Sequence, residues 1–447
     1  MSVAATTSDS SSDQGPGQAS DQASREEATL FAWVAQVCGG PVRRSVQTSG
    51  GNRARSWAMD VDAPEGLREV FLRYSPPRPP GVEPYTTHRE AQVYRAIAGI
   101  DIRAPKLIAE HPEIPAILTD RAHGIAEFRR LTDAPVKQAI AAEVMQDLAR
   151  LHAHAAGGVA LDAGGTGPRI ADHIRAELAI WRAMYDEAGR PDALLDLAFR
   201  WLEDNMPDPD GPVALVHGDA GPGNFLFEHG RLTALIDWEL AHLGDPMDDL
   251  AWFSMRCVME PVPDFAAAIA AYEQAAGHKV DRARILYHRV LVSTRVVVIR
   301  HRNVTGEFAH AIVSRALNRR LLIEALSEAS GTPVRWPAPL AVAPTPRAPL
   351  FAAILADLRD VIVPRSTDGQ VIAKAKNAAK VLKYLEAWDR LGPALEAADQ
   401  NDAAGAETEA GFAAALNRLA AQSAREAQLA SGASGGIASR HYPALPE

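Results

Sequence analysis

The sequence predicts an α+β protein with a small strand-rich lobe, a larger and mostly helical lobe, and further helices beyond a linker. Residues 42–119 contain short alternating apolar segments, which are typical of strands, whereas most of 135–330 repeats apolar residues every three or four positions, as helices do. Six prolines between Pro333 and Pro349 interrupt the helical pattern, which resumes at residue 350. These observations divide the chain into two lobes and a C-terminal helical module.

Composition narrows the range of partners. The chain has 447 residues, of which 47% are hydrophobic and 23% charged, as in soluble globular proteins. A formal net charge of −10 disfavours nucleic acid as the main partner, and no apolar run is long enough to cross a membrane. The two cysteines, Cys38 and Cys257, supply neither a disulfide framework nor a zinc motif. We expect a cytoplasmic protein that binds neither nucleic acid nor membrane, and the oligomeric state stays open.

The first lobe is expected to span 26–121, after a disordered segment, 1–25, that is rich in Ser, Asp, Gln and Gly. A helix over 26–37 is expected to end where Gly39 and Gly40 follow it. Alternating segments then predict a small sheet that is accompanied by one more helix. The expected strands are 42–48, 55–61, 69–74 and 116–119, and the expected helix is 88–97.

The second lobe is expected to span 122–330 and to be helical apart from one island of strands at 212–237. Its expected helices begin near Pro135, cover 170–187 and 193–204, and resume from Asp248. A semi-rigid linker at 331–349, a helical module at 350–430 and a flexible tail at 431–447 complete the expected organisation.

The segment from Ala214 to Glu239 carries the chemistry. An apolar strand leads into His-Gly-Asp, a loop rich in Gly leads to Asn224, and two further apolar segments lead to Asp237. Phosphoryl transfer depends on positioned groups and on charge neutralisation. An Asp on a tight loop can accept a hydroxyl proton, while an Asn five residues later and an Asp at the end of a neighbouring strand can hold magnesium through hard oxygen atoms. We therefore predict Asp219 as the catalytic base and Asn224 and Asp237 as magnesium ligands.

HGDAGPGN, residues 217–224, resembles the H-G-D-x-x-x-x-N catalytic loop of the aminoglycoside phosphotransferase family, and IDWE, residues 236–239, resembles its metal-binding segment. The resemblance covers roughly 28–330. It implies a bilobal, protein-kinase-like fold, with an antiparallel sheet in the N-lobe and a mostly helical C-lobe, that binds ATP and magnesium between the lobes. Asp249, in a segment similar to the family's G-D-P-x-x-D-L-A helix, would then brace the catalytic loop.

The same resemblance implies the nucleotide-binding residues. Ser49, Gly50, Gly51 and Asn52 occupy the place of the family's phosphate-covering turn, and the backbone of Thr119 and Arg121 occupies the hinge that would hold adenine. Arg73 stands where the family has a lysine that pairs the nucleotide phosphates, and its expected partner is Glu90. An ordinary surface ion pair between Arg73 and Glu90 is the alternative.

Three functions remain open at this level. VFLRYSPP, residues 70–77, resembles a segment of the subgroup associated with acyl-CoA dehydrogenases, which implies a kinase that phosphorylates a hydroxyacyl-CoA such as 4-hydroxyacyl-CoA. The helical module is similar to a small partner protein found beside such kinases. An aminoglycoside or macrolide kinase is the first alternative. An inactive nucleotide-binding adaptor is the second, and Arg73 is the feature that speaks for it.

Overall fold

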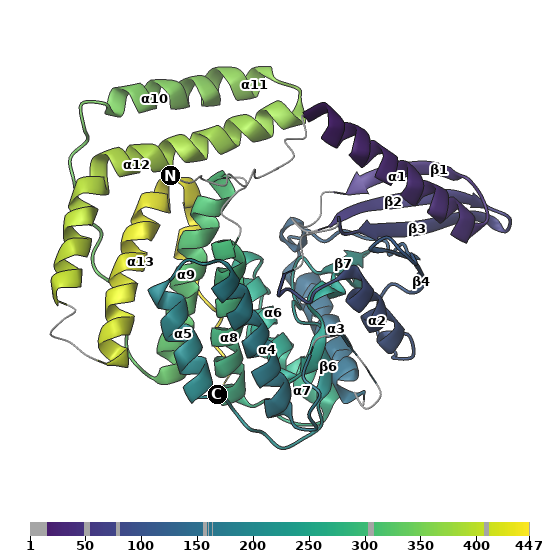
Figure 1. Ribbon diagram of the computed structural model, residues 1–447. Helices are drawn as coiled ribbons and strands as arrows, with labels where there is room; N and C mark the ends of the chain where they lie inside the picture. Colours follow the sequence, from purple (N-terminus) through teal and green to yellow (C-terminus); the bar gives the residue numbers. More distant parts are fainter. Residues whose placement is uncertain are drawn as a thin grey trace, which may run out of the picture. The chain divides into compact units, whose positions relative to one another are not determined.

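The computed structural model describes residues 16–48, 54–76, 81–154, 159, 161–162, 164–302, 308–405 and 411–446 (Figure 1). These residues form two compact units. Unit 1 comprises the described parts of 1–78, 86–91 and 105–121, and unit 2 comprises the described remainder of the chain. The predicted α+β class, with an antiparallel sheet near the N-terminus and a mostly helical remainder, is confirmed.

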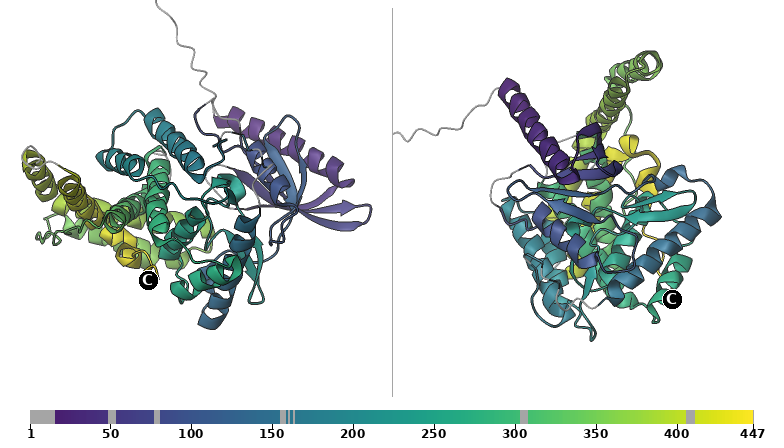
Figure 2. Two further views of the ribbon diagram at one scale, coloured as in Figure 1. Left: turned by 90° about the horizontal axis from the view of Figure 1, so that it is seen from below. Right: turned by 90° about the vertical axis from the view of Figure 1, so that its right-hand side faces the viewer.

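Unit 1 is a five-stranded antiparallel sheet covered by a helix. The strands follow the order β1-β2-β3-β5-β4, and α1 lies along one face of the sheet (Figure 2). The elements are α1 (Pro16–Cys38), β1 (Val42–Thr48), β2 (Arg55–Ala63), β3 (Gly66–Tyr74), β4 (Leu107–Glu110) and β5 (Ala116–Asp120). Alternate residues of β2 and β3 point to α1 and bury a core that includes Leu30, Val34, Trp57 and Met59.

Two expectations for unit 1 need correction. The helix α1 begins at Pro16 instead of residue 26, so that 16–25 are helical and not disordered as expected. Proline suits the first turn of a helix, and the alanines and glutamines that follow are good helix formers, which outweighs the polar composition. The strand β4 was not predicted, because its four residues, Leu107–Glu110, are all partly buried and show no alternation.

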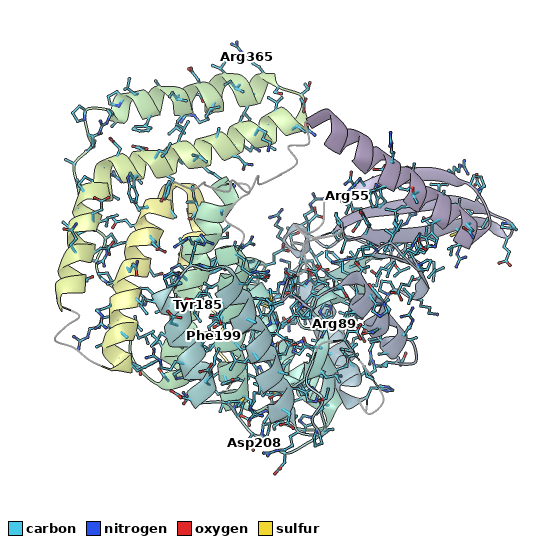
Figure 3. All side chains as sticks on the ribbon, viewed as in Figure 1. Arg55, Arg89, Tyr185, Phe199, Asp208 and Arg365 are labelled. Carbon is cyan, nitrogen blue, oxygen red and sulfur yellow. The ribbon has the colours of Figure 1, made fainter. Side chains whose placement is uncertain are left out.

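Unit 2 consists mainly of helices, with two short pairs of strands inserted among them. The strand pairs are antiparallel, β6 with β9 and β7 with β8. Helix α6 packs against α8, and α8 packs against α9. Between α4 and α5, the rings of Tyr185 and Phe199 stack with centroids 5.8 Å apart (Figure 3). The elements in this part are α2 (Thr87–Ile97, which begins in unit 1), α3 (Ala134–Ala153), α4 (Ile170–Glu187), α5 (Ala193–Asp204), β6 (Ala214–Val216), β7 (Phe225–Glu228), β8 (Arg231–Leu235), β9 (His242–Gly244), α6 (Met247–Met259), α7 (Phe265–Ala276), α8 (Arg282–Arg302) and α9 (Phe308–Ser330).

The helices after the linker belong to unit 2 and are not a separate body. They are α10 (Ala348–Ala356), a π-helical stretch (Asp357–Ile362), α11 (Val363–Arg365), α12 (Gly369–Gly405) and α13 (Phe412–Ser434). Helices α10 and α11 lie beside α12 (Figure 1), while α13 packs against α9 and α5. The physical reason is that α13 buries Leu416 and Ala420 within unit 2 and pairs its Glu426 with Arg319 of α9 at 3.2 Å.

The expected flexible tail at 431–447 is also wrong for the residues that the structure describes. A 3-10 turn, Gly435–Ser439, follows α13, and the next residues bind along unit 2, where Leu445 is buried. Arg440 and Tyr442 make hydrogen bonds that hold this segment in place. The composition, which is rich in Gly, Ser and Pro, gave no sign of these contacts. Within the described ranges, no helix has the length and apolar character that a membrane crossing requires.

Candidate active site

The predicted catalytic loop follows the buried strand β6. The loop turns sharply after His217, and Gly218 and Gly221 have φ angles of +76° and +136°, which favour glycine. A Cβ atom on Gly221 would also lie 2.7 Å from Cβ of Arg256. The loop therefore needs glycine at this point, and it presents Asp219 with its side chain 14% exposed.

The hairpin of β7 and β8 brings Asn224 close to the segment that carries Asp237. The backbone N–H of Ile236 donates to the carbonyl of Asn224 at 3.0 Å, immediately before Asp237. Asn224 donates its side-chain N–H to the carbonyl of Asp219 at 2.9 Å, so its amide oxygen points away from that carbonyl. Asp237 has a φ of +68°, a left-handed conformation that is uncommon for a residue other than glycine and is often found at functional sites.

The donor set fits magnesium better than zinc. Asn224 and Asp237 offer one amide and one carboxylate oxygen, and magnesium takes one or two protein oxygens while phosphates and waters fill its other positions. Nowhere in the described ranges do three or more His, Cys, Asp or Glu side chains form a cluster that could hold a metal ion. The two residues would thus suit a metal that enters together with a nucleotide.

Arg256 is the site residue that sequence reasoning missed. Its Nε donates to Oδ1 of Asp219 at 2.8 Å, and its Nη2 donates to Oδ2, so both carboxylate oxygens are engaged. Burial raises the pKa of Asp219, and the Arg256 guanidinium opposes that rise. The available signal was spacing, since Arg256 follows Asp249 by seven residues, or two helical turns, on the same face of α6.

Asp249 braces the catalytic loop, as expected. It is fully buried and accepts hydrogen bonds from the backbone N–H groups of His217 (2.7 Å) and Gly218 (2.8 Å). His152 lies 2.9 Å from the same carboxylate and 2.8 Å from the hydroxyl of Tyr272. Asp249 of α6 and His152 of α3 together fix the start of the loop. Asp249 therefore supports the catalytic loop and takes no direct part in the reaction.

His217 has a structural role. Its Nε2 donates to the carbonyl of Ile236 at 3.0 Å, and its ring lies against that of Trp238 with centroids 4.5 Å apart. The side chain therefore ties the catalytic loop to the segment that carries Asp237.

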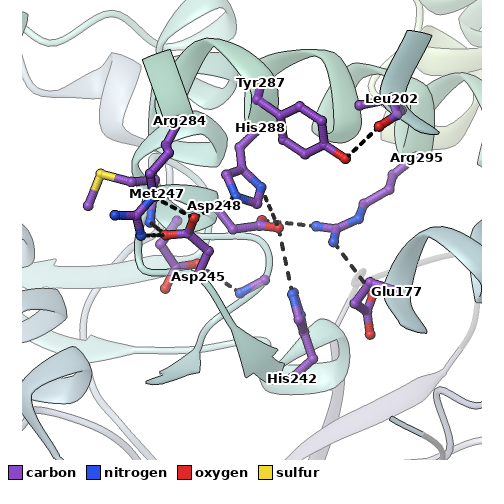
Figure 4. A network of polar contacts seen from close by, with 12 residues as sticks. Glu177, Leu202, His242, Asp245, Met247, Asp248, Arg284, Tyr287, His288 and Arg295 are labelled. Atoms are coloured by element: carbon purple, nitrogen blue, oxygen red, sulfur yellow. Dashed lines mark hydrogen bonds and ion pairs between the residues drawn. The ribbon is translucent and has the colours of Figure 1, made fainter. Parts of the chain in front are cut away.

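A buried ionic network holds the first turn of α6 (Figure 4). His288 lies between Asp245 (3.1 Å) and Asp248 (3.4 Å), and Arg295 donates to Asp248 at 2.9 Å. Burial would lower the pKa of His288, but the two carboxylates raise it to about 9. Burial would raise the pKa of Asp245, but His288 and Arg284 lower it to about 2. The network connects α6 to α8 and so restrains the helix that carries both Asp249 and Arg256.

In unit 1 the structure brings Arg73 and Glu90 together. Their Nε and Oε2 atoms are 3.1 Å apart, and the side chains are only 15% and 3% exposed, so this is not a surface ion pair. Thr119 is buried in β5. The side chain of Arg121 pairs with Asp60 of β2 at 2.9 Å and also with Glu69 of β3. The expected phosphate-covering turn, Ser49, Gly50, Gly51 and Asn52, lies outside the described residues.

Comparison with known proteins gives a family and several relatives. Acyl-CoA dehydrogenase family member 11 of Homo sapiens is 30% identical over 204 residues, which are 43% of this chain and 26% of that protein. Viomycin phosphotransferase of Streptomyces vinaceus is 31% identical over 178 residues, 36% of this chain and 59% of that protein. The crystal structure of macrolide 2'-phosphotransferase from Brachybacterium faecium aligns at 21% identity with a TM-score of 0.46, covering 64% of this chain and 97% of that one.

The family match covers more of the chain than the individual relatives do. This chain spans about a quarter of the length of the first curated relatives. Residues 46–286, by contrast, match the phosphotransferase enzyme family, and this segment includes Arg73, Asp219, Asn224, Asp237 and Arg256. The match extends over more than half of the chain and confirms the resemblance from which its kinase-like fold was predicted. The chain belongs to the phosphotransferase enzyme family.

Proposed function

We propose that this phosphotransferase transfers the γ-phosphoryl group of ATP, with magnesium, to a hydroxyl of a small molecule. One observation carries the proposal: hydrogen bonds join the loop that contains Asp219 and Asn224 to the segment that leads to Asp237. The buried carboxylate of Asp249 fixes the start of the same loop. Rigid positioning of this kind is the main requirement of phosphoryl transfer.

Asp219 is the proposed catalytic base. It accepts the proton of the acceptor hydroxyl while the hydroxyl oxygen bonds to the γ-phosphorus and the bond to the bridging oxygen of ADP breaks. Arg256 occupies one lone pair on each carboxylate oxygen of Asp219, and each oxygen retains a second lone pair for the incoming hydroxyl. Because Arg256 opposes the effect of burial, it also favours the ionised form that a base requires.

The nucleotide is assigned to the residues that the resemblance to the family implies. Asn224 and Asp237 would hold magnesium, which when bound neutralises charge on the phosphates. Arg73, paired with Glu90, would bind the phosphates, since arginine keeps the positive charge of the usual lysine and can donate two hydrogen bonds. The backbone at Thr119 and Arg121 would hold adenine, and Ser49, Gly50, Gly51 and Asn52 would cover the phosphates.

For the acceptor we propose a hydroxyacyl-CoA, such as 4-hydroxyacyl-CoA, or the corresponding hydroxy acid. Support comes from relatives that are named as acyl-CoA dehydrogenase family members. The second candidate is an antibiotic, which the similarity to viomycin phosphotransferase favours. The joint presence of Asp219, Asn224 and Asp237 argues against an inactive adaptor.

The test is ATP turnover with magnesium against a panel of acceptors: a 4-hydroxyacyl-CoA, its free acid, an aminoglycoside, a macrolide and choline. The Asp219→Asn variant is the matched control. Turnover with the acyl-CoA or its acid, lost in the variant, supports the proposal. Turnover with an antibiotic alone selects the second candidate, and equal turnover in the variant shows that Asp219 is not the base.

A further inference from the structure

The chain returns to α6 after its C-terminal helices. We call residues 440–445 the strap. Arg440 donates through Nη1 to the carbonyls of Val258 (3.3 Å) and Met259, the last two residues of α6. The last carbonyls of a helix have no partner within the helix, so Arg440 caps α6 with a positive charge at its negative end. In turn, the carbonyl of Arg440 accepts from Arg320 of α9, which fixes the strap itself.

Tyr442 binds the turn just before that cap. Its hydroxyl lies 2.6 Å from Oγ of Ser293 and donates toward Sδ of Met255 at 3.5 Å. The guanidinium of Arg289 lies over the ring, with Cζ 4.8 Å from the centroid. Tyr442 therefore contacts α8 at Ser293 and α6 at Met255, the residue that directly precedes Arg256.

Arg289 connects the strap to α6 a second time. Its side chain is 1% exposed and donates to the carbonyl of Pro443 (2.7 Å), to Oγ of Ser254 (3.0 Å) and to Glu328 (2.9 Å). If the buried guanidinium lost one of these acceptors, it would remain charged but would lack a hydrogen-bond partner. Breaking one of these contacts therefore costs free energy. The guanidinium of Arg289 thus binds both the strap, at Pro443, and α6, at Ser254.

These contacts enclose Arg256 on both sides along α6, at residues 254–255 and at 258–259. We propose that the strap positions Arg256 on Asp219, so that Arg440 and Tyr442 are positioning residues for phosphoryl transfer. The inference rests on the proposed function of Asp219 as the base. It also gives the C-terminal helices a function, because they bring the strap back to α6, the helix that carries Arg256.

The first test compares Arg440→Met, Tyr442→Phe and the double variant with the parent chain. The probe is phosphate release from MgATP with water as acceptor, repeated with any acceptor found in the panel. We expect kcat to fall about tenfold in the double variant while KM for ATP changes less than about twofold, because a small displacement of a catalytic group impairs chemistry more than binding. The matched control is Arg425→Met, which removes two ion pairs between α13 and α12 and should leave kcat unchanged.

A double-mutant cycle with Arg256→Met separates positioning from mere packing. If the strap acts through Arg256, the strap substitutions lower kcat no further in the Arg256→Met background. The proposal would be overturned if the strap substitutions and Arg256→Met lowered kcat by independent factors that multiply. It would also be overturned if the strap double variant had the kcat of the parent chain.

Hydrogen exchange at the amides of 254–259 supplies a readout that does not need activity. Faster exchange in the double variant than in Arg425→Met is expected, and unchanged exchange would overturn the hold of the strap on α6. If the parent chain turns over no MgATP with any acceptor, the proposed function fails, and the exchange result still decides whether the strap fixes this turn.

Discussion

Replacing Asp249 by asparagine removes the brace of the catalytic loop with almost no change of shape. The carboxylate accepts from His217 N, Gly218 N and His152, whereas an amide offers one acceptor oxygen and turns an N–H group toward a donor. At least one buried backbone N–H then has no acceptor, which costs about 1–3 kcal/mol, and the other bonds lose the assistance of a charge. We expect the free energy of unfolding to fall by about 2–4 kcal/mol.

The assay is urea denaturation, with MgATP turnover measured on the same samples. Asp264→Asn is the matched control, because Asp264 is an exposed N-cap of α7 and asparagine caps as well as aspartate. That variant should unfold within about 0.5 kcal/mol of the parent chain. Turnover of Asp249→Asn should fall about 100-fold, since the loop with Asp219 loses its fixed start. If Asp249→Asn unfolds like the control and keeps its turnover, the brace has no energetic role.

Three further predictions follow from the same geometry. Arg256→Met should lower kcat about 10- to 100-fold with little change in KM for ATP. Arg256→Lys should recover only part of this loss, because the lysine ammonium lacks the planar fork with which arginine engages both oxygens of Asp219, and a lysine variant with full kcat would show that the bidentate contact is unimportant. His288 has a folded pKa of about 9 against an ordinary 6.5, so its stabilisation is present below pH 6.5 and is lost as pH rises through 9; the thermal midpoint should fall over this range in the parent and stay flatter in His288→Gln. Chelation of magnesium with EDTA should abolish turnover and excess magnesium should restore it, whereas turnover that persists in EDTA would exclude the assigned metal role.

The sequence was most informative where local pattern decides the structure. The bounds of α4 and α5 were predicted to the residue, because apolar residues recur in them every three or four positions. The bounds of β1 were also predicted to the residue, because Gly40 and Pro41 precede it and a turn segment that starts at Ser49 follows it. The joint spacing of Asp219, Asn224 and Asp237 was visible because one loop and one hairpin determine it.

What the sequence could not show depends on contacts between distant segments. The strand β9 has only three residues and is defined by its pairing with β6, so the sequence contains no periodic pattern that would predict it. Arg256 has the appearance of an ordinary helix cation until α6 is placed against the catalytic loop. Arg440 and Tyr442 lie in a stretch whose Gly and Ser content predicts flexibility, and only α6, α8 and α9 give them partners.

The most direct test of the account is transfer of labelled γ-phosphate from ATP to the acceptor, measured for the parent chain and for Asp219→Asn at saturating MgATP. The account predicts label on the acceptor hydroxyl with the parent chain, a loss of at least about 100-fold in the variant, and similar affinity of both for ATP. Equal transfer by the variant would contradict the assignment of Asp219 as the base, and label released only as free phosphate by both proteins would contradict the proposed kinase activity toward that acceptor.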